Sequence, residues 1–274
     1  MLYTPTKRAK NKLIKAFKIV AFLYFLIGIV LCMFQEKLLF LPTVLAEDYK
    51  YTSVYNFEEI TLEPEDNVTL NAIHYKVEKP KGVMLYFHGN AGDLSRWSKV
   101  SEFFVAKNYD VMIMDYRTYG KSKGKLSEQA FYNDAQLFYN YLLKQYEASK
   151  ITIYGRSLGT GIATYVASKN KAKQLILETP YSSITAVAKH RFPVFPIKWL
   201  LKYKFPSEDF IKKVTCPITI FHGTEDKVVP YQFGVKLAEQ AKNNQVNFIT
   251  IDNGSHNNLV TFDAYLEGIE KMLL

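Results

Sequence analysis

Hydrophobic residues form one long uncharged run near the N-terminus, at residues 19–34, IVAFLYFLIGIVLCMF. As a helix, this run spans about 24 Å. The aliphatic stem of Lys18 allows Ala16 and Phe17 to extend the apolar length toward the roughly 30 Å hydrocarbon core of a bilayer. The pattern therefore predicts one transmembrane anchor helix at 19–34, behind a basic segment at 1–18. The basic residues of that segment are Lys7, Arg8, Lys10, Lys12, Lys15 and Lys18.

Three interpretations of this run compete: an uncleaved anchor, a cleaved signal peptide and a buried core helix. Signal cleavage requires small residues at A-x-A spacing, and the flank LCMFQEKLLF has none. Lipoprotein processing at Cys32 would require a small residue where Leu31 stands. We therefore expect an uncleaved anchor. Positive charges before the run and the mixed sequence QEK after it place the N-terminus in the cytoplasm and the residues after Phe34 on the far side of the membrane.

Short apolar runs at regular spacing dominate the rest of the chain. Residues 57–77 alternate between apolar and polar positions about a polar turn, which predicts an antiparallel hairpin. From Gly82 onward the apolar runs end in Gly, Asp, Ser or Thr, and helical patterns such as 127–148 and 158–169 lie between several of them. This alternation predicts an α/β domain at 57–274 whose sheet is mostly parallel, with helices on both faces. The runs are GVMLYFHG, YDVMIMDY, KITIYGRS, KQLILET, CPITIFHGT and VNFITIDNG.

Two segments do not fit this alternation. Residues 35–56 connect the anchor to the domain, and we expect their apolar part, EKLLFLPTVL, to lie along either the membrane surface or the body of the domain. Residues 180–213 contain four prolines and many aromatic side chains, between a strand ending near Thr179 and one starting near Pro217. That length exceeds a plain connection between two strands. It predicts a small inserted lid at 180–213.

Composition and charge narrow the class of protein. With 274 residues, 48% hydrophobic and 15% aromatic, the chain can bury one large core. The formal net charge of +9 is concentrated before the anchor, so the remainder is only mildly basic and nucleic-acid binding is not expected. Cys32 lies in the apolar run and Cys216 in a predicted strand, so they are not expected to form a disulfide. We expect Cys216 to fill core space.

The motif Gly-x-Ser-x-Gly falls where a predicted strand becomes a predicted helix, in YGRSLGTG. Ligands and catalytic groups collect at the carboxyl ends of parallel strands, and Ser157 follows the strand at 151–154. Gly155 and Gly159 suit a turn too tight for side chains on either side of the serine. Ser157 is therefore a candidate nucleophile, although a serine at such a junction can also be incidental.

A serine hydroxyl needs a base, and the base needs an acceptor that fixes its tautomer. His256, in DNGSHNN, is the one histidine after the last predicted strand, whereas His88 and His222 precede glycines at strand ends and are expected to be structural. Asp226, in FHGTEDKVVP, is the expected acid. The order Ser157, Asp226, His256 is the one that a nucleophile elbow requires. Glu225 and Asp252 remain alternatives for the acid.

An oxyanion hole is expected from two backbone amides. One follows the nucleophile, at Leu158, and the other comes from the loop after the third strand, FHGNAGD, where Asn90 is the expected donor. The proposed chemistry needs neither a metal nor an organic cofactor.

Taken together, these blocks resemble the α/β-hydrolase superfamily, and most closely its branch of membrane-anchored, single-pass serine hydrolases. The resemblance covers nearly the whole chain and implies the α/β-hydrolase fold, with Ser157 as nucleophile, Asp226 as acid, His256 as base, and Asn90 and Leu158 as oxyanion donors. It also implies that the strand-end turn at 115–117 is structural. Thr118 and Ser255 depart from glycines that are usual in the family. The blocks are FQEKLLFLP, YFHGNAGD, DYRTYGKSKG, YGRSLGTG, CPITIFHGTEDKVVP and GSHNNL.

The substrate is expected to be a small-molecule or lipid acyl ester or thioester. Phe192, Phe195 and Trp199 of the lid are candidates to line an acyl-chain site, together with Tyr203 and Phe205, or they pack the lid onto the sheet. A serine peptidase of the same fold and a non-catalytic membrane-tethered binding protein are the alternatives. The sequence does not define the oligomeric state.

Overall fold

A computed structural model describes residues 7–64, 66, 68–241 and 246–273. Within these residues, eight strands form one sheet in the order β10-β9-β8-β7-β4-β6-β3-β2. The first six residues of the predicted basic segment lie outside the described residues. The strands of the sheet are β2 (Phe57–Leu62), β3 (Leu70–Tyr75), β4 (Val83–Phe87), β6 (Asp110–Met114), β7 (Ile151–Arg156), β8 (Gln174–Glu178), β9 (Ile218–Gly223) and β10 (Val246–Ile251).

The sheet is mostly parallel, as the sequence predicts. Strands β6, β4, β7, β8, β9 and β10 run parallel to their neighbours in this group, and β3 pairs antiparallel with both β2 and β6. The central strands are buried along their whole length, because helices cover both faces of a parallel sheet. The edge strand β2 contains exposed and half-buried residues but none that are fully buried, as expected for an edge strand with one solvated face. The turn predicted inside the hairpin falls partly outside the described residues.

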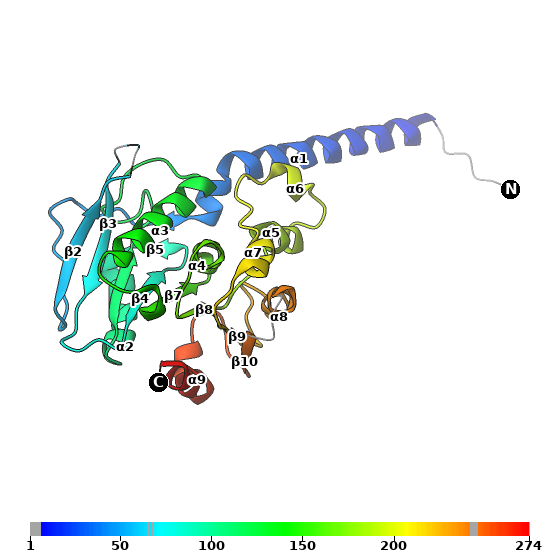
Figure 1. The fold of residues 1–274 in the computed structure, drawn as a ribbon. Helices are drawn as coiled ribbons and strands as arrows, with labels where there is room; N and C mark the ends of the chain where they lie inside the picture. Colours follow the sequence, from blue (N-terminus) through cyan, green and yellow to red (C-terminus); the bar gives the residue numbers. More distant parts are fainter. Residues whose placement is uncertain (1–6, 65, 67, 242–245, 274) are drawn as a thin grey trace.

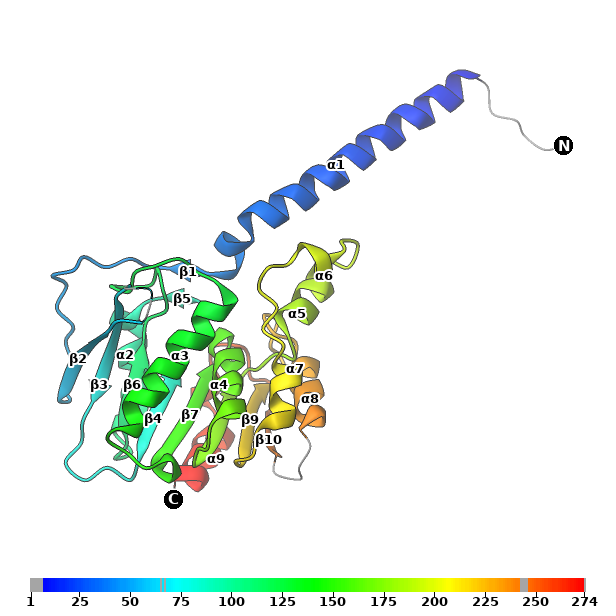
Figure 2. The same cartoon turned by 45° about the horizontal axis from the view of Figure 1, so that its top comes forward.

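Helices form a layer on each face of the sheet (Figures 1 and 2). Successive side chains of β4 point to opposite faces: Leu85 and Phe87 join the core under α3, α4 and α8, and Met84 and Tyr86 join the core under α2 and α9. The sequence thus buries two cores against one sheet, and the carboxyl ends of the parallel strands remain open at one edge. The helices are α2 (Leu94–Val105), α3 (Glu128–Leu143), α4 (Leu158–Lys169), α8 (Tyr231–Gln240) and α9 (Asp263–Leu273).

The insertion, residues 180–213, forms three short helices, the first two near the carboxyl edge of the sheet and the third beside α4 and α8 (Figure 2). These are α5 (Ile184–Arg191), α6 (Ile197–Leu200) and α7 (Ser207–Phe210), followed by a 3-10 turn at Ile211–Lys213. Its last part belongs to the core, because Tyr203, Phe205 and Ile211 are buried in the cluster under α4. Its middle, by contrast, exposes Val194 and Trp199. Only the middle of the insertion therefore stands free of the domain.

The N-terminal helix α1 (Lys7–Leu39) extends away from the domain (Figure 1). It is longer than the predicted span at 19–34, and its stretch Lys10–Leu39 is long and apolar enough to cross a membrane. The most apolar part of that stretch has no buried residue. Directly after α1, the chain enters the domain: Phe40 is buried in the core, and β1 (Leu41–Pro42) pairs in parallel with β5 (Ala91–Gly92). The sequence left two positions open for the apolar segment EKLLFLPTVL, along the membrane surface or along the domain. The structure has the part after α1 along the domain.

Candidate active site

Ser157 lies on a sharp turn between β7 and α4. Its backbone adopts φ 51° and ψ −116°, a conformation in the left-handed region that non-glycine residues rarely occupy. The neighbouring chain leaves no room for side chains beside it, because a Cβ on Gly159 would lie 2.0 Å from the Phe87 carbonyl oxygen and one on Gly155 would lie 2.5 Å from the Gly159 carbonyl oxygen. The Ser157 amide donates to the Glu178 carbonyl at 2.9 Å. This strained turn lifts the serine hydroxyl out of the sheet edge.

His256 lies beside this hydroxyl, in the loop between β10 and α9. Its Nε2 is 2.9 Å from Ser157 Oγ, and its Nδ1 is 2.7 Å from Asp226 Oδ2. The Asp226 carboxylate accepts a hydrogen bond from Nδ1–H, so the ring proton stays on Nδ1 and Nε2 is free to accept the hydrogen bond from the serine. Residues 99 and 30 positions apart in the sequence thus form one hydrogen-bonded chain.

Asp226 is buried and held in a fixed orientation. Its Oδ1 accepts hydrogen bonds from the amides of Val228 and Val229, both at 2.8 Å. Burial raises the pKa of this carboxyl, but hydrogen bonds from His222, His256 and the Val229 amide outweigh burial and hold the pKa well below its ordinary value of 3.8. Asp226 is therefore ionised at neutral pH, with its negative charge next to the imidazole.

The other candidates for acid and base lie elsewhere. Glu225 and Asp252 are exposed, and the carboxylate that bonds His256 Nδ1 is that of Asp226. His88 Nδ1 lies 2.7 Å from the Gly89 carbonyl oxygen, beneath the oxyanion loop, and His222 Nε2 lies 2.8 Å from the Val229 carbonyl oxygen. Both histidines are fully buried, as expected for structural residues.

The residues of the two expected oxyanion donors, Leu158 and Asn90, line the same cavity as Ser157. Leu158 is the first residue of α4, so its amide has no acceptor within the helix. Asn90 lies in the loop between β4 and β5, and hydrogen bonds hold its side-chain NH₂ group and its backbone carbonyl. Its side-chain amide donates to the Leu39 carbonyl at 3.1 Å, and its carbonyl accepts from the Leu41 amide at 2.9 Å and the Tyr119 hydroxyl at 2.7 Å. These contacts fix the loop from both sides.

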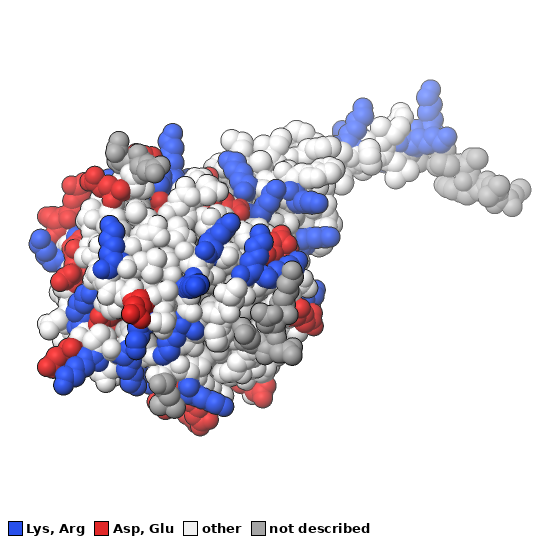
Figure 3. All heavy atoms as spheres, viewed as in Figure 1, with Lys and Arg blue, Asp and Glu red and all other residues white. Residues whose placement is uncertain are grey.

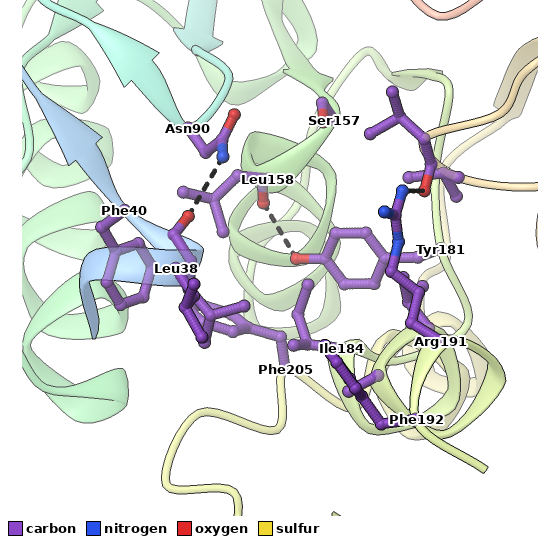
Figure 4. A pocket seen from close by; sticks show the side chains of 15 residues that line it. Leu38, Phe40, Asn90, Ser157, Leu158, Tyr181, Ile184, Arg191, Phe192 and Phe205 are labelled. Carbon is purple, nitrogen blue, oxygen red and sulfur yellow. Dashed lines mark hydrogen bonds between the residues drawn. The ribbon is translucent and has the colours of Figure 1, made fainter. Parts of the chain in front are cut away.

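A cavity of about 360 Å³ opens in front of Ser157 (Figure 4). This volume lies within the range of small-molecule sites. Arg191 is the one charged residue among the described residues that line it, and its guanidinium donates to the carbonyls of Lys227 and Val228. The cavity is otherwise mainly apolar. Its lining is Leu38, Leu39, Phe40, Asn90, Ser157, Leu158, Tyr181, Ile184, Val187, Ala188, Arg191, Phe192, Phe205, Val228 and Val229.

The predicted aromatic lining of the lid needs correction at three positions. One is Tyr203, which is buried in the core and is not among the residues that line the cavity. Phe192 lines the cavity, as does Phe205. Phe195 does not, because its ring stacks on Tyr24 of α1 at a centroid distance of 4.8 Å. Trp199 is 86% exposed and is not among the residues that line the cavity. Composition alone could not separate the side chains that turn toward the serine from those that turn outward.

Three parts of the site were not identified from the sequence. Leu38 and Leu39, at the end of α1, line the cavity, and β1 pairs with the oxyanion loop through β5. Behind the elbow, the buried carboxylate of Glu178 bonds Arg156 Nε at 3.1 Å. The tyrosines Tyr154 and Tyr265 also donate to Glu178. The signal that could have found the first two is the apolar block FQEKLLFLP, which continues the helix into the domain.

The described side chains of this site do not form a set of metal ligands. Among the described residues, no group of three or more His, Cys, Asp or Glu side chains converges in a way that could hold a metal. Cys216 is buried in the core and burial raises the pKa of its thiol to about 11, so it remains a neutral space-filling side chain.

Comparison with known proteins identifies the class. A family model described as "Serine aminopeptidase, S33" matches residues 78–210. Protein bem46 of Schizosaccharomyces pombe is 32% identical over 232 residues, covering 79% of this chain and 76% of that protein. Lysophosphatidylserine lipase ABHD12 of Danio rerio is 31% identical over 183 residues, and the match covers 58% of this chain but only 47% of that protein.

The fold has solved counterparts. The Pyrococcus furiosus esterase Pf2001 superposes with a TM-score of 0.68 over 85% of this chain and 98% of the esterase, at 18% sequence identity. The sequence relatives, together with this fold, show that the chain belongs to the α/β-hydrolase superfamily. It is a serine hydrolase of that superfamily, carrying an N-terminal helix long and apolar enough to be an anchor.

Proposed function

We propose that this protein is a membrane-anchored serine hydrolase that cleaves carboxylic ester or thioester bonds of amphiphilic acyl substrates through Ser157, His256 and Asp226. The observation that carries the proposal is the hydrogen-bonded chain from Asp226 to Ser157 Oγ at the mouth of an apolar cavity. A hydroxyl with a base at 2.9 Å, and a base held by a buried carboxylate, are the parts that nucleophilic acyl transfer requires.

In the first half-reaction, Ser157 Oγ attacks the carbonyl carbon while His256 Nε2 takes the hydroxyl proton. The carbonyl oxygen becomes an oxyanion that accepts hydrogen bonds from the Leu158 and Asn90 amides, and Asp226 stabilises the imidazolium. When the tetrahedral intermediate collapses, the bond to the alcohol or thiol breaks and His256 protonates that leaving group. An acyl group then remains on Ser157.

In the second half-reaction, water replaces the alcohol. His256 takes a proton from the water as its oxygen attacks the acyl carbon, and the same two amides hold the second oxyanion. Collapse breaks the bond to Ser157 Oγ, which recovers its proton from His256. The products are the alcohol or thiol and the carboxylic acid, and the enzyme returns to its starting state.

The lining of the cavity supports an apolar acyl group as the substrate. Apolar side chains line the space in front of the serine, among them Ile184, Val187, Phe192 and Phe205. Each methylene buried there contributes about 0.8 kcal/mol to binding. One relative is named as a lysophosphatidylserine lipase, which agrees with an amphiphilic lipid ester.

An aminopeptidase activity is the second candidate, because the family model that matches residues 78–210 carries that description. A peptidase of this kind has to bind a substrate ammonium group, which calls for a carboxylate near the serine. Among the described residues that line the cavity, the charged group is Arg191, a cation. The site therefore favours an acyl group over a peptide amine. A purely binding function is disfavoured, because the nucleophile, base and acid are all present with hydrogen-bonding geometry.

A substrate panel tests the proposed function. The purified protein would be offered p-nitrophenyl esters of increasing acyl length, matching thioesters and aminoacyl p-nitroanilides, with Ser157→Ala as the blank. We expect kcat/KM to rise from acetyl to medium acyl chains by roughly fourfold for each methylene that is buried, with anilides at the level of the blank. A preference for anilides, or for the shortest esters, would contradict the proposal.

We further propose that α1 crosses the membrane with its basic end in the cytoplasm and the hydrolase domain on the far side. The support is the excess of Lys and Arg at the N-terminal end of α1, visible at the far tip of the helix in Figure 3. Protease added outside intact cells or spheroplasts is expected to digest the domain. Full protection of the domain, with digestion only after permeabilisation, would reverse the orientation.

A further inference from the structure

The insertion is held against α1 at two levels of the helix. Near the C-terminal end of α1, the side chain of Gln35, which is 5% exposed, donates to the Leu200 carbonyl at 3.2 Å. The same side chain accepts from the Lys202 amide at 2.7 Å. Further toward the N-terminus of α1, the Phe195 ring stacks on Tyr24, whose hydroxyl donates to the Val194 carbonyl at 3.0 Å. The insertion therefore follows α1 rather than only touching its base.

These contacts fix how far the insertion reaches along α1. Tyr24 and Gln35 are eleven residues apart, which is about 16 Å along a helix. Tyr24 lies inside the uncharged run 19–34, as does Gly28, whose position lies within 4 Å of the Phe195 ring. If that run lies in the hydrocarbon core of a bilayer, the part of the insertion packed against Tyr24 must lie there too.

The sequence of that part is suited to such an environment. Residues 192–197, FPVFPI, carry no charge and include two prolines, which have no amide proton to satisfy. Val194 and Trp199 are among the most exposed large apolar side chains outside α1. Exposed apolar groups gathered in one place mark a surface that meets another apolar phase. Lys and Arg side chains gather around the base of α1 and the insertion, where lipid headgroups would lie (Figure 3).

A second, narrower cavity of about 70 Å³ lies between α1 and the insertion. It lies directly beside the cavity in front of Ser157, because Leu38, Leu39, Ala188 and Phe192 line both. Among the described residues, its lining is apolar except for Gln35. The residues that line only the second cavity are Leu31, Gln35, Ile197, Leu200 and Leu201.

We propose that the tip of the insertion, the uncharged residues 192–197 together with Trp199, lies within the bilayer beside α1, and that the second cavity is the passage through which the acyl chain of a membrane lipid reaches Ser157. Lys198, between these residues, is exposed, and its aliphatic stem allows the ammonium group to extend to the headgroups. The proposal rests on the proposed hydrolase function and adds the route and the physical state of the substrate. The acyl chain of the lipid leaves the bilayer sideways, between the apolar surfaces of α1 and the insertion. Its methylenes therefore stay out of water along the way. The ester group then arrives at the polar end of the cavity, next to the serine.

Tryptophan fluorescence tests the position of the tip. The chain has two tryptophans: Trp97 is 5% exposed inside the domain, and Trp199 is on the tip. The full chain would be reconstituted in phosphatidylcholine vesicles with and without bromine on the acyl chains. We expect bromine to quench the emission of Trp199, and the quenching to be lost in Trp199→Phe. Equal emission from the wild type in both kinds of vesicle would overturn the proposal.

Filling the second cavity tests the passage. Leu31→Trp and, independently, Leu201→Trp place a large ring in it, and Leu26→Trp is the matched control on α1 because Leu26 lines neither cavity. The substrates would be p-nitrophenyl palmitate in vesicles and p-nitrophenyl acetate in solution. We expect both filling variants to lose at least tenfold in kcat/KM for the palmitate, since two displaced methylenes correspond to about fifteenfold. Acetate hydrolysis is expected to stay within about twofold, and Leu26→Trp to change neither rate by more.

The outcomes separate this proposal from the proposed function. Equal losses on both substrates in both filling variants, or no loss on palmitate in either, would overturn the passage and leave the hydrolase function standing. Absence of Ser157-dependent hydrolysis of either substrate in the wild type would overturn the proposed function, and the passage would fall with it.

Discussion

Replacing Ser157 by alanine is expected to lower kcat/KM for an acyl ester by about 10⁴-fold or more. Loss of one member of a nucleophile–base–acid set removes nearly all of the catalysis that the set provides, and what remains comes from binding and the oxyanion donors. The assay is hydrolysis of a medium-chain p-nitrophenyl ester by detergent-solubilised protein. Retention of more than about one hundredth of the wild-type rate would show that another group attacks the carbonyl.

The fold is expected to tolerate this change. Alanine at position 157 occupies the same left-handed backbone conformation as serine, so the strain at φ 51° is common to both proteins. The variant loses the hydrogen bond to His256, which contributes about 1 kcal/mol and lowers the midpoint of thermal unfolding by about 2–4 °C. A much larger drop would mean that the loss of activity reports misfolding rather than the missing hydroxyl.

Asp226→Asn is expected to lower kcat by about 10⁴-fold while preserving the shape of the site. Both carboxylate oxygens act as acceptors, one from His256 Nδ1 and the other from the amides of Val228 and Val229. An amide group offers only one acceptor oxygen. If that oxygen faces the two backbone amides, the NH₂ group faces Nδ1 and reverses the tautomer of the imidazole, so that Nε2 no longer accepts the serine proton. Asp252→Asn is the matched control, because Asp252 is exposed and the carboxylate that bonds His256 Nδ1 is that of Asp226.

Asp226→Asn is also expected to change how the free energy of unfolding depends on pH. The pKa of Asp226 is lowered in the folded protein, against the opposing effect of burial, by hydrogen bonds from His222, His256 and the Val229 amide. A carboxyl with a lowered folded pKa stabilises the fold above its unfolded pKa, near 3.8, and loses that contribution as the pH falls below it. The wild type is therefore expected to exceed Asp226→Asn in free energy of unfolding at pH 7, and the gap to narrow at pH 3. A gap that is constant with pH would contradict this assignment of the charge.

The order of strands and helices could be predicted from the sequence, because each parallel strand has a recognisable local pattern of residues. A continuous apolar run such as 151–154, followed by Gly155 and Ser157, specifies a strand, its end and the turn after it within a few residues. The relation of Ser157 to Asp226 and His256 then follows from topology, since parallel strands bring their carboxyl ends to one edge. Local pattern and topology together were sufficient to select three residues that the structure places within hydrogen-bonding distance.

The parts that the sequence did not predict depend on contacts between distant apolar surfaces. Nothing in the pattern of residues 180–213 indicates that Phe192 turns toward the cavity, Phe195 toward Tyr24 and Trp199 away from both. All three are aromatic, and the choice among them is made by the position of α1. For the same reason the contribution of Leu38 and Leu39 to the cavity was not foreseen, because an apolar run long enough for a membrane carries no mark of where it meets a domain.

The central claim is that the hydroxyl of Ser157 is the nucleophile, and the most direct measurement is covalent labelling by a fluorophosphonate followed by mass spectrometry of the modified peptide. The phosphonate forms a stable bond to an activated serine oxygen as fluoride leaves, with the proton going to the base. The account predicts one adduct on the wild type, located at Ser157, no adduct on Ser157→Ala and much slower labelling of His256→Ala. A wild-type protein that stays unlabelled, or equal labelling of the wild type and Ser157→Ala, would contradict it.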